Sequence, residues 1–473
     1  MPLSDAANVS PVPGKAFWRQ RIDGFLATPW YVALVCALAL ASNIFSLELP
    51  VYTVYAALVA YICFFGSSIL PLMPVMVCGY VTPSAVNNPG QNAESVFSGA
   101  GGVYVAVMGT VIGVSCLYRV IRDRKCYFAK KYKLLPGMLL LSLAYLAGGI
   151  GTPGYWDRFG RNILFAFLQC ASLMVLYLLF SGGVDWKNAP REYFGWSGFF
   201  LGCVLLGQLL WIYLTGDVVS DGVIDRGRIY TGWGIHNNLG GMLAMMIPFA
   251  FYLGTKHRKG WLGPVAGFVF LLGVFLSCSR NAILTGCGIY FVGIVLMLYY
   301  AKNRKANTVA VLVCLGAAAA LVIVFNQRIL RLFSDILSLG FDPNSRDSIY
   351  GKGMEMFSRY PVFGCSFFSP DLTAWDWATL ESFSGFIPPR WHNTVVQLLA
   401  SCGVVGLAAY LFHRVQTVVL LLRTRHKEAV FIGCSVLALL VCSLFDCHFF
   451  NIGPTMFYSI ALAVAENCGE KQE

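Results

Sequence analysis

Residues 261–300 read WLGPVAGFVFLLGVFLSCSRNAILTGCGIYFVGIVLMLYY, two apolar runs with Arg280 between them. The runs cover residues 261–277 and 281–300, about the 17 to 25 residues that a helix needs to cross a bilayer. A guanidinium placed between two such runs with hardly any loop costs roughly 2–3 kcal/mol at mid-membrane, so it needs a polar partner. This stretch therefore predicts a membrane-embedded helical hairpin with an unusual arginine at its tip.

The same apolar pattern extends over most of the chain, and it predicts an all-α polytopic membrane protein. Of the 473 residues, 57% are hydrophobic and only 12% are charged. We expect about fourteen transmembrane helices, with twelve as the alternative count, near residues 29–47, 51–65, 67–80, 102–118, 134–151, 162–180, 194–214, 237–254, 261–277, 281–300, 307–325, 393–412, 429–446 and 450–465.

We expect residues 1–473 to form a single integral membrane domain, because no polar stretch is long enough for a separate soluble one. Two external loops interrupt it, at residues 216–236 and 326–392. The larger loop is predicted to contain short amphipathic helices. One covers residues 329–337, and a second starts near Ser345 and stops at Pro361.

Positive charge predicts the orientation of the chain. Seven Lys and Arg residues crowd the connection at residues 119–133, whereas residues 81–101 have none, so the first connection is expected in the cytoplasm. This requires three crossings before Val81 and places both termini in the cytoplasm. The net charge of +11 is thus explained by short cytoplasmic loops beside anionic membrane lipids, and a nucleic-acid partner is not expected.

The cysteines do not indicate a metal site. The 16 cysteines are mostly scattered singly within the apolar spans, and no CxxC pair or Cys/His cluster with zinc spacing occurs. We therefore predict no metal and no cofactor.

Polar side chains that gather at the external face are the candidates for function. Arg226 and Arg228 lie in the glycine-rich first loop before His236, and their alternative role is to pair with acidic neighbours or to reach lipid headgroups. In the second loop, Arg346 stands in the first turn of the expected helix, where an anion would meet backbone donors. At the end of this loop, residues 390–393 contribute Arg390, His392 and Asn393. A neutral imidazole there can accept a proton from a hydroxyl, although a lone histidine is more often structural.

Taken together, these pieces resemble the O-antigen ligase and O-antigen polymerase superfamily of polytopic glycan transferases. The resemblance rests on residues 228–238, on Ser279–Arg280, on residues 345–346 with 361–364, on His392–Asn393 and on residues 403–406. Their order around one large external loop matches the family from about Gly216 to Tyr410.

The resemblance implies metal-independent transfer of a glycan from a polyprenyl diphosphate, such as undecaprenyl diphosphate, to an acceptor hydroxyl at the outer face of the cytoplasmic membrane. It implies that Arg280 and Arg228 bind the diphosphate and that His392 activates the acceptor, with Arg226 as the alternative to Arg228. Further substrate contacts are expected from Arg346, Arg390, Asn393 and His236. The acceptor is a lipid or a glycan in this family.

Other functions stay open from the sequence. A polysaccharide polymerase of the same superfamily differs only in its acceptor. A polymerase of peptidoglycan strands would use an acidic residue of the large loop, among Asp335, Asp342, Asp347, Glu355, Asp371, Asp376 and Glu381. A lipid-glycan flippase or transporter would need charges deep within several spans and repeated halves. A non-catalytic scaffold would tolerate replacement of the arginines.

Overall fold

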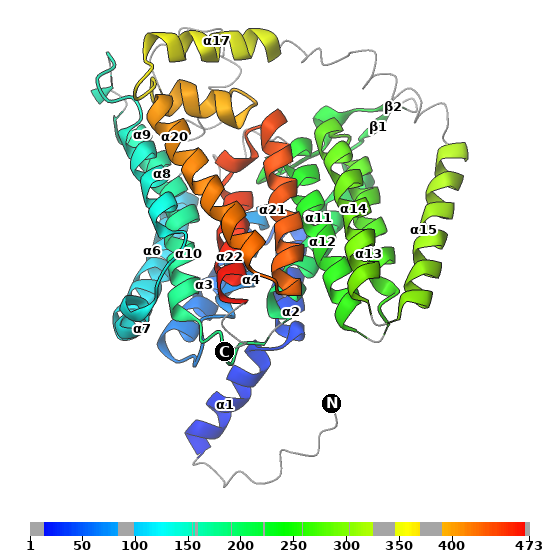
Figure 1. The fold of residues 1–473 in the computed structure, drawn as a ribbon. Helices are drawn as coiled ribbons and strands as arrows, with labels where there is room; N and C mark the ends of the chain where they lie inside the picture. The colour runs from blue at the N-terminus through cyan, green and yellow to red at the C-terminus, as the bar shows by residue number, and fades with distance from the viewer. Residues whose placement is uncertain are drawn as a thin grey trace.

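A computed structural model describes residues 14–83, 99–153, 155–156, 159–190, 192–220, 223–257, 259–301, 303–324, 346–368 and 390–468. The described chain is almost entirely helical (Figure 1). Its helices before the first external loop are α1 (Gly14–Leu26), α2 (Pro29–Phe45), α3 (Glu48–Phe64), α4 (Leu72–Val81), α6 (Gly99–Arg122), α7 (Arg124–Ala129), α8 (Leu135–Ala147), α9 (Phe159–Cys170), η2 (Ala171–Val175), α10 (Leu176–Gly183) and α11 (Tyr193–Thr215).

The second half of the chain contains the remaining helices and two small hairpins. The hairpins are β1 (Val219–Ser220) with β2 (Val223–Ile224), and β3 (Tyr230–Thr231) with β4 (Gly234–Ile235), both antiparallel. The helices are η3 (Arg226–Arg228), α12 (His236–Lys256), α13 (Leu262–Leu276), α14 (Arg280–Tyr300), α15 (Arg304–Val324), α17 (Arg346–Arg359), α20 (Thr394–Arg423), α21 (Lys427–Phe445), η4 (His448–Phe450) and α22 (Ile452–Asn467).

The all-α polytopic prediction is confirmed, and the described residues form a helix within each of the fourteen expected spans. Eight described helices are long and apolar enough to cross a membrane, with the continuous α9, η2 and α10 (Phe159–Gly183) taken as one, or up to nine if a bent pair forms one span. The others are shorter, and α4 (Leu72–Val81) rises only about 15 Å at 1.5 Å per residue. The expected break within residues 51–80 is present, because α3 ends at Phe64 and α4 begins at Leu72.

Helix α12 lies at the centre of the bundle and packs against α11, α13, α14 and α21. Residues 238–255 of this helix are all buried, Asn238 among them, whereas His236 and Asn237 at its start are partly exposed. By contrast, the outward faces of α14 and α15 expose large apolar side chains. Leu284, Phe291, Val313 and Ile323 are between 63% and 72% exposed, as expected for side chains that face lipid. The chain is therefore a multi-pass membrane protein.

The two ends of the bundle differ in character (Figure 1). Helix α17 lies across one end, beside the upper part of α20, and hairpin β1–β2 is at the same end, whereas α7 and the C-terminus are at the other. The basic connection at residues 119–133 and the external loop at 216–236 therefore lie at opposite ends, in agreement with the charge pattern. Orientation relative to the cytoplasm stays a prediction.

Candidate active site

Three helices meet around the last turn of α21, at the end of the bundle where α17 lies. Asn281, in the first turn of α14, donates from Nδ2 to the Cys442 carbonyl at 2.9 Å. Asn393, just before α20, donates from Nδ2 to the Leu444 carbonyl at 2.8 Å. The Leu444 carbonyl is among those that the end of a helix leaves without an intrahelical partner, whereas the Cys442 carbonyl also accepts from the Asp446 N–H at 3.0 Å. As a result, the neighbours of these asparagines, Arg280 and His392, are held beside one helical turn.

His392 faces a buried carboxylate directly after that turn. Its Nδ1 lies 3.3 Å from Oδ1 of Asp446, whose side chain is 6% exposed, while His392 itself is 32% exposed. The backbone of His392 has φ of 49°, a left-handed conformation that is uncommon outside glycine. Such strain persists only where surrounding contacts hold it and is frequent at functional sites.

The carboxylate of Asp446 is kept ionised by its surroundings. Burial raises its pKa, but the His392 hydrogen bond and the nearby His448, His392 and Arg390 outweigh burial and hold the pKa well below its usual range. An ionised carboxylate only accepts hydrogen bonds, so the proton of His392 is assigned to Nδ1. Nε2 of His392 is then the acceptor nitrogen, as a general base requires.

His448 occupies the buried side of the same carboxylate. Burial lowers its pKa, against the raising effect of Asp446. Its ring packs against Gly241 in the central helix α12, where an added Cβ would lie 2.8 Å from Cε1 of the ring. His448 is thus a packed core residue, whereas His392 is the histidine that remains partly accessible.

Helix α17 fixes the backbone that carries His392. The hydroxyl of Tyr350 donates to the His392 carbonyl at 3.2 Å. Trp391 is 2% exposed and packs beside Gly353 of α17, in a small apolar cluster with Met356. The predicted helix that stops at Pro361 therefore exists, and it serves to hold the residue before α20.

Helix α20 is broken at Gly403, and the chain after α17 is hydrogen-bonded to it there. We call this joint, residues 361–366 with 400–405, the backbone latch. Gly403 has φ of 64° and ψ of −160°, so the α20 hydrogen bonds between residues 400–401 and 404–405 are lost. The N–H groups of Cys365 and Ser366 donate instead to the Ala400 and Ser401 carbonyls at 2.7 and 3.0 Å. In return, the carbonyls of residues 361 and 362 accept from the N–H groups of residues 404 and 405 at 2.9 and 3.3 Å. Every backbone group freed by the break is satisfied.

Two glycines make the backbone latch possible. Gly364 and Gly403 both have positive φ, and a Cβ at either position would overlap the backbone of the other strand of the latch. The segments at 361–364 and 403–406, separate in the sequence, are therefore one structural device, which positions α17 and the start of α20.

We expect Gly403→Ala to destabilise the protein. The backbone of Gly403 lies in a region that is essentially restricted to glycine, which costs about 1–3 kcal/mol for another residue, and the overlap with Val362 adds to this. Thermal unfolding in detergent should show a lower Tm. Gly316→Ala, on the open face of α15 where nothing lies within 4 Å, is the control and should be neutral or slightly stabilising. An unchanged Tm for Gly403→Ala would contradict the role of the latch.

Arg280 begins α14 at the short link after α13. Its side chain is partly exposed, and among the described residues it has no hydrogen-bond or ion-pair partner. The link is tightly constrained, because Cys278 has φ of 55° and Ser277 hydrogen-bonds back to Val274. The arginine that the sequence marks as unusual is therefore held in place by its backbone, while its guanidinium has no protein partner in the described part of the chain.

The two arginines of the first loop differ in their surroundings. Arg228 forms an ion pair with Asp225, with Nε 3.3 Å from Oδ2, and donates to the Asp217 carbonyl at 3.0 Å. Its side chain is half exposed. Arg226 lies within electrostatic range of Cys278, in the α13–α14 link that leads to Arg280. Arg228 is thus paired locally, which is the alternative role that the sequence gives it, and the electrostatic effect of Arg226 on the Cys278 thiol links this loop to the surroundings of Arg280.

The glycine-rich part of that loop forms hairpin β3–β4, with Trp233 at its turn. Trp233 is buried and donates from Nε1 to Gln208 at 3.0 Å. The helix that follows, α12, begins at His236 with Ile235 as its N-cap, so neither Asn237 nor Asn238 caps it. Asn238 is already one turn into the bundle, where it accepts a hydrogen bond from Asn451 at 2.8 Å.

Four helices begin at this end of the bundle, namely α12, α14, α20 and α22. Hydrogen bonds join the first turns of these helices to the end of α21 or to one another. They are Asn281–Cys442, Asn393–Leu444 and Asn238–Asn451. The N-termini of these helices carry partial positive charge, and the C-terminus of α21, which carries partial negative charge, lies against those of α14 and α20.

Several residues that the sequence singles out lie outside the described residues. These include the expected amphipathic helix at 329–337 and the acidic residues Asp335, Asp342, Asp371, Asp376 and Glu381. Helix α17 begins at Arg346, as expected, and nothing is described of that side chain. Glu355 is described, and it forms ion pairs on the α17 surface with Lys352 and Arg359, so its surroundings are those of a surface residue.

A family model described as O-antigen ligase matches residues 265–411. The match supports the O-antigen ligase superfamily for this chain. The matched segment begins in α13, includes Arg280, His392 and both halves of the backbone latch, and ends in α20. No curated protein matches the chain. An O-antigen ligase or polymerase type of function is therefore supported at the level of the superfamily.

The sequence analysis missed Asp446 as a member of the site. It lies 54 residues after His392 and beyond the matched segment, at the end of an apolar span. One signal was present, because Asp446 is an acidic residue that follows directly on the apolar run at residues 429–445. An ionisable group at such a boundary needs a partner or a function.

Proposed function

We propose that this protein is a glycosyltransferase that moves a glycan from a polyprenyl diphosphate to an acceptor hydroxyl at the outer face of the cytoplasmic membrane. One observation carries the proposal. His392, which pairs with Asp446, and Arg280, which has no partner among the described residues, each adjoin an asparagine that is hydrogen-bonded to the last turn of α21. Both lie within the segment that matches the O-antigen ligase family model.

In the proposed reaction, Nε2 of His392 accepts the proton of the acceptor hydroxyl. The oxygen then attacks the anomeric carbon, and the bond from that carbon to the diphosphate oxygen breaks. Asp446 holds the imidazole through Nδ1 and stabilises the imidazolium that forms, as a carboxylate does in other histidine bases. A single displacement of this kind inverts the configuration at the anomeric carbon.

The leaving lipid diphosphate is assigned to Arg280. A diphosphate gains negative charge as the sugar leaves, and a guanidinium can bind two of its oxygens at once. The convergent N-termini of α12, α14, α20 and α22 add favourable potential at the same end. Arg226 is placed to assist through the α13–α14 link, with Arg228 as the alternative. Arg390, close to Asp446, and Asn393 are proposed substrate contacts, as are His236 and Arg346.

Ligase and polymerase activities remain two forms of this proposal, because they differ only in whether the acceptor is a lipid or another glycan. The described contacts concern the donor and the base, which both forms share. A flippase is not favoured, since Arg280, which has no partner among the described residues, and the paired His392 both lie at one end of the bundle rather than along a path through it.

The test is transfer by the purified protein in detergent or liposomes, with a synthetic polyprenyl-diphosphate oligosaccharide as donor. Product is detected by mass spectrometry with each candidate acceptor, a lipid anchor or a second oligosaccharide. We expect transfer to continue at an unchanged rate in excess chelator, because arginine rather than a metal ion is assigned to the diphosphate. Loss of transfer on chelation, with recovery on adding Mg²⁺, would contradict that assignment.

A further inference from the structure

Gln397 is a buried glutamine near the start of α20, and the proposed reaction does not use it. Its side chain is only 2% exposed. It belongs to a polar stripe on a mainly apolar helix, because Asn393, Gln397 and Ser401 follow one another at intervals of four residues and so lie on one face. A buried amide is costly unless its hydrogen bonds are made, so both ends of this side chain need partners.

The amide oxygen of Gln397 joins the two residues that flank the His392–Asp446 pair. It accepts from the backbone N–H of Trp391 at 3.1 Å and from the thiol of Cys447 at 3.5 Å. Trp391 directly precedes His392, and Cys447 directly follows Asp446. The thiol can donate because burial raises the pKa of Cys447 to about 12 and so keeps it protonated. One oxygen atom therefore connects the backbone before the histidine to the residue after the carboxylate.

The orientation of the Gln397 amide is fixed by its partners. A backbone N–H can only donate, so the atom that meets Trp391 must be the oxygen. The amide nitrogen, Nε2, donates to Oγ of Ser401 at 3.0 Å. The carbonyl of Ser401 in turn accepts from the N–H of Ser366, in the backbone latch, at 3.0 Å. Gln397 thus links the latch to the surroundings of the proposed base.

The contact between His392 and Asp446 depends on the backbone on both sides of it. Nδ1 lies 3.3 Å from Oδ1, at the long end of hydrogen-bond distances. On one side, Oδ1 of Asp446 also accepts from the Cys447 N–H at 2.7 Å, so Cys447 holds the carboxylate through its backbone and meets Gln397 through its side chain. On the other side, the left-handed backbone of His392 is strained and persists only where neighbouring contacts hold it.

Building on the proposed function, we propose that Gln397 is a positioning residue for the general base. Its amide oxygen keeps the backbone before His392 and the residue after Asp446 at a fixed separation, and it touches neither the substrate nor the transferred proton. Without it, the imidazole moves away from Asp446 and spends less time in the reactive position. Binding of the donor, which is assigned to Arg280, does not depend on this contact, so the loss belongs to kcat rather than to KM.

The test compares Gln397→Met with Gln416→Met in the full-length protein in detergent. Methionine has a similar length and removes both hydrogen-bonding atoms. Gln416 is the matched control, because it lies about five turns further along the same helix and its Oε1 also accepts from a backbone N–H, that of Gly137, at 2.9 Å. We expect Gln397→Met to lower kcat about ten- to a hundredfold, the usual result of a small misplacement of a reacting group, with little change in the KM for the donor. Gln416→Met should keep the parental kcat.

Hydrogen–deuterium exchange tests the contact itself without reference to transfer. Mass spectrometry of peptides that cover residues 390–396 should show faster exchange of the Trp391 amide in Gln397→Met than in the parent or in Gln416→Met. If Gln397→Met folds poorly, Cys447→Ala takes its place, because it removes one of the two donors to the same oxygen. Cys447→Ser keeps a donor there and should retain more of the parental kcat than Cys447→Ala.

The positioning role and the proposed function fail in different ways. A parental kcat in Gln397→Met, alongside reduced transfer by His392→Ala, overturns the positioning role and leaves the proposed function in place. A loss that appears only in KM, or an unchanged exchange rate of the Trp391 amide, has the same meaning. Parental transfer by His392→Ala would instead overturn the proposed function, and the positioning role with it.

Discussion

Replacing His392 by alanine should reduce glycan transfer by about 10²–10⁴-fold, the usual contribution of a general base. The expected loss is in kcat, because the imidazole is assigned to the proton of the acceptor rather than to binding of the donor. Single-turnover transfer from the polyprenyl-diphosphate donor measures it. Asp446→Asn keeps the size of the side chain that meets Nδ1 but removes its charge, so it should give a smaller loss in the same direction.

The matched control for His392 is His257, a partly exposed histidine that forms the C-cap of α12 and lies beside Glu192. His257→Ala should transfer at the parental rate. Added imidazole should restore part of the activity of His392→Ala and none of that of Arg280→Ala, because only the first lacks a base. Undiminished transfer by His392→Ala would remove the base from the mechanism, whatever the arginine variants do.

Replacing Arg280 by alanine should reduce transfer by about 10²–10³-fold, as expected for one group that stabilises developing charge. Arg280→Lys should fall between the parent and Arg280→Ala, because lysine keeps the charge and loses the two-pronged contact with phosphate oxygens. Since Arg280 has no partner among the described residues, its removal breaks no described ion pair, and the Tm should change little.

Arg304→Ala is the control for Arg280. It starts the next helix, α15, with an exposed side chain near the Tyr299 carbonyl, at the end away from α17. Its transfer rate should equal that of the parent. Comparison of Arg226→Ala with Arg228→Ala under the same conditions decides which loop arginine assists, and the contacts favour the larger loss for Arg226→Ala. Parental activity in Arg280→Ala would contradict the assignment of the diphosphate to Arg280. The role of His392 would still be decided by its own variants.

The helices were predictable because apolar length and helix-breaking residues are local signals. The break between α3 and α4, the short link before Arg280 and the end of α17 before Pro361 all follow from residues within a few positions of one another. The number of membrane crossings was harder to fix, since α4, α8 and α13 are apolar but short, and their length does not separate a full span from a partial one.

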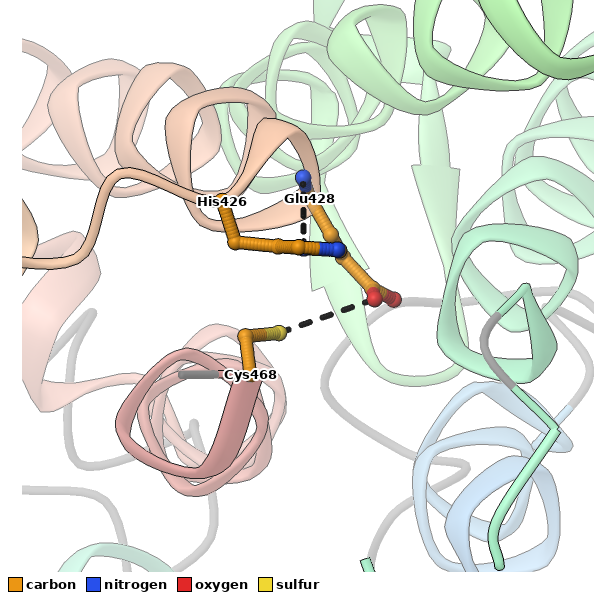
Figure 2. A group of neighbouring side chains, drawn as sticks. All are labelled: His426, Glu428 and Cys468. Carbon is orange, nitrogen blue, oxygen red and sulfur yellow. Dashed lines mark hydrogen bonds between the residues drawn. The ribbon is translucent and has the colours of Figure 1, made fainter. Parts of the chain in front are cut away.

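What the sequence did not reveal depends on residues far apart in the chain. His392 meets Asp446 across 54 positions, and Glu428 meets Cys468 across 40. Figure 2 shows the second of these contacts, in which Cys468 donates to the carboxylate of Glu428 at the start of α21. The sequence likewise did not decide the partner of Arg228, because an arginine close to an aspartate is compatible with either a local ion pair or a ligand site.

The backbone latch bears on how such proteins can diverge. Its hydrogen bonds are all made by peptide groups, so the exposed side chains at residues 361–363 and 404–405 can change without breaking them, whereas those at 365–366 and 400–402 are buried. Only Gly364 and Gly403 are constrained by the close approach itself. The exposed residues of the latch can therefore vary among related proteins that use different sugars and acceptors, while Gly364 and Gly403 preserve the joint. We expect distant relatives to share little more than these glycines here.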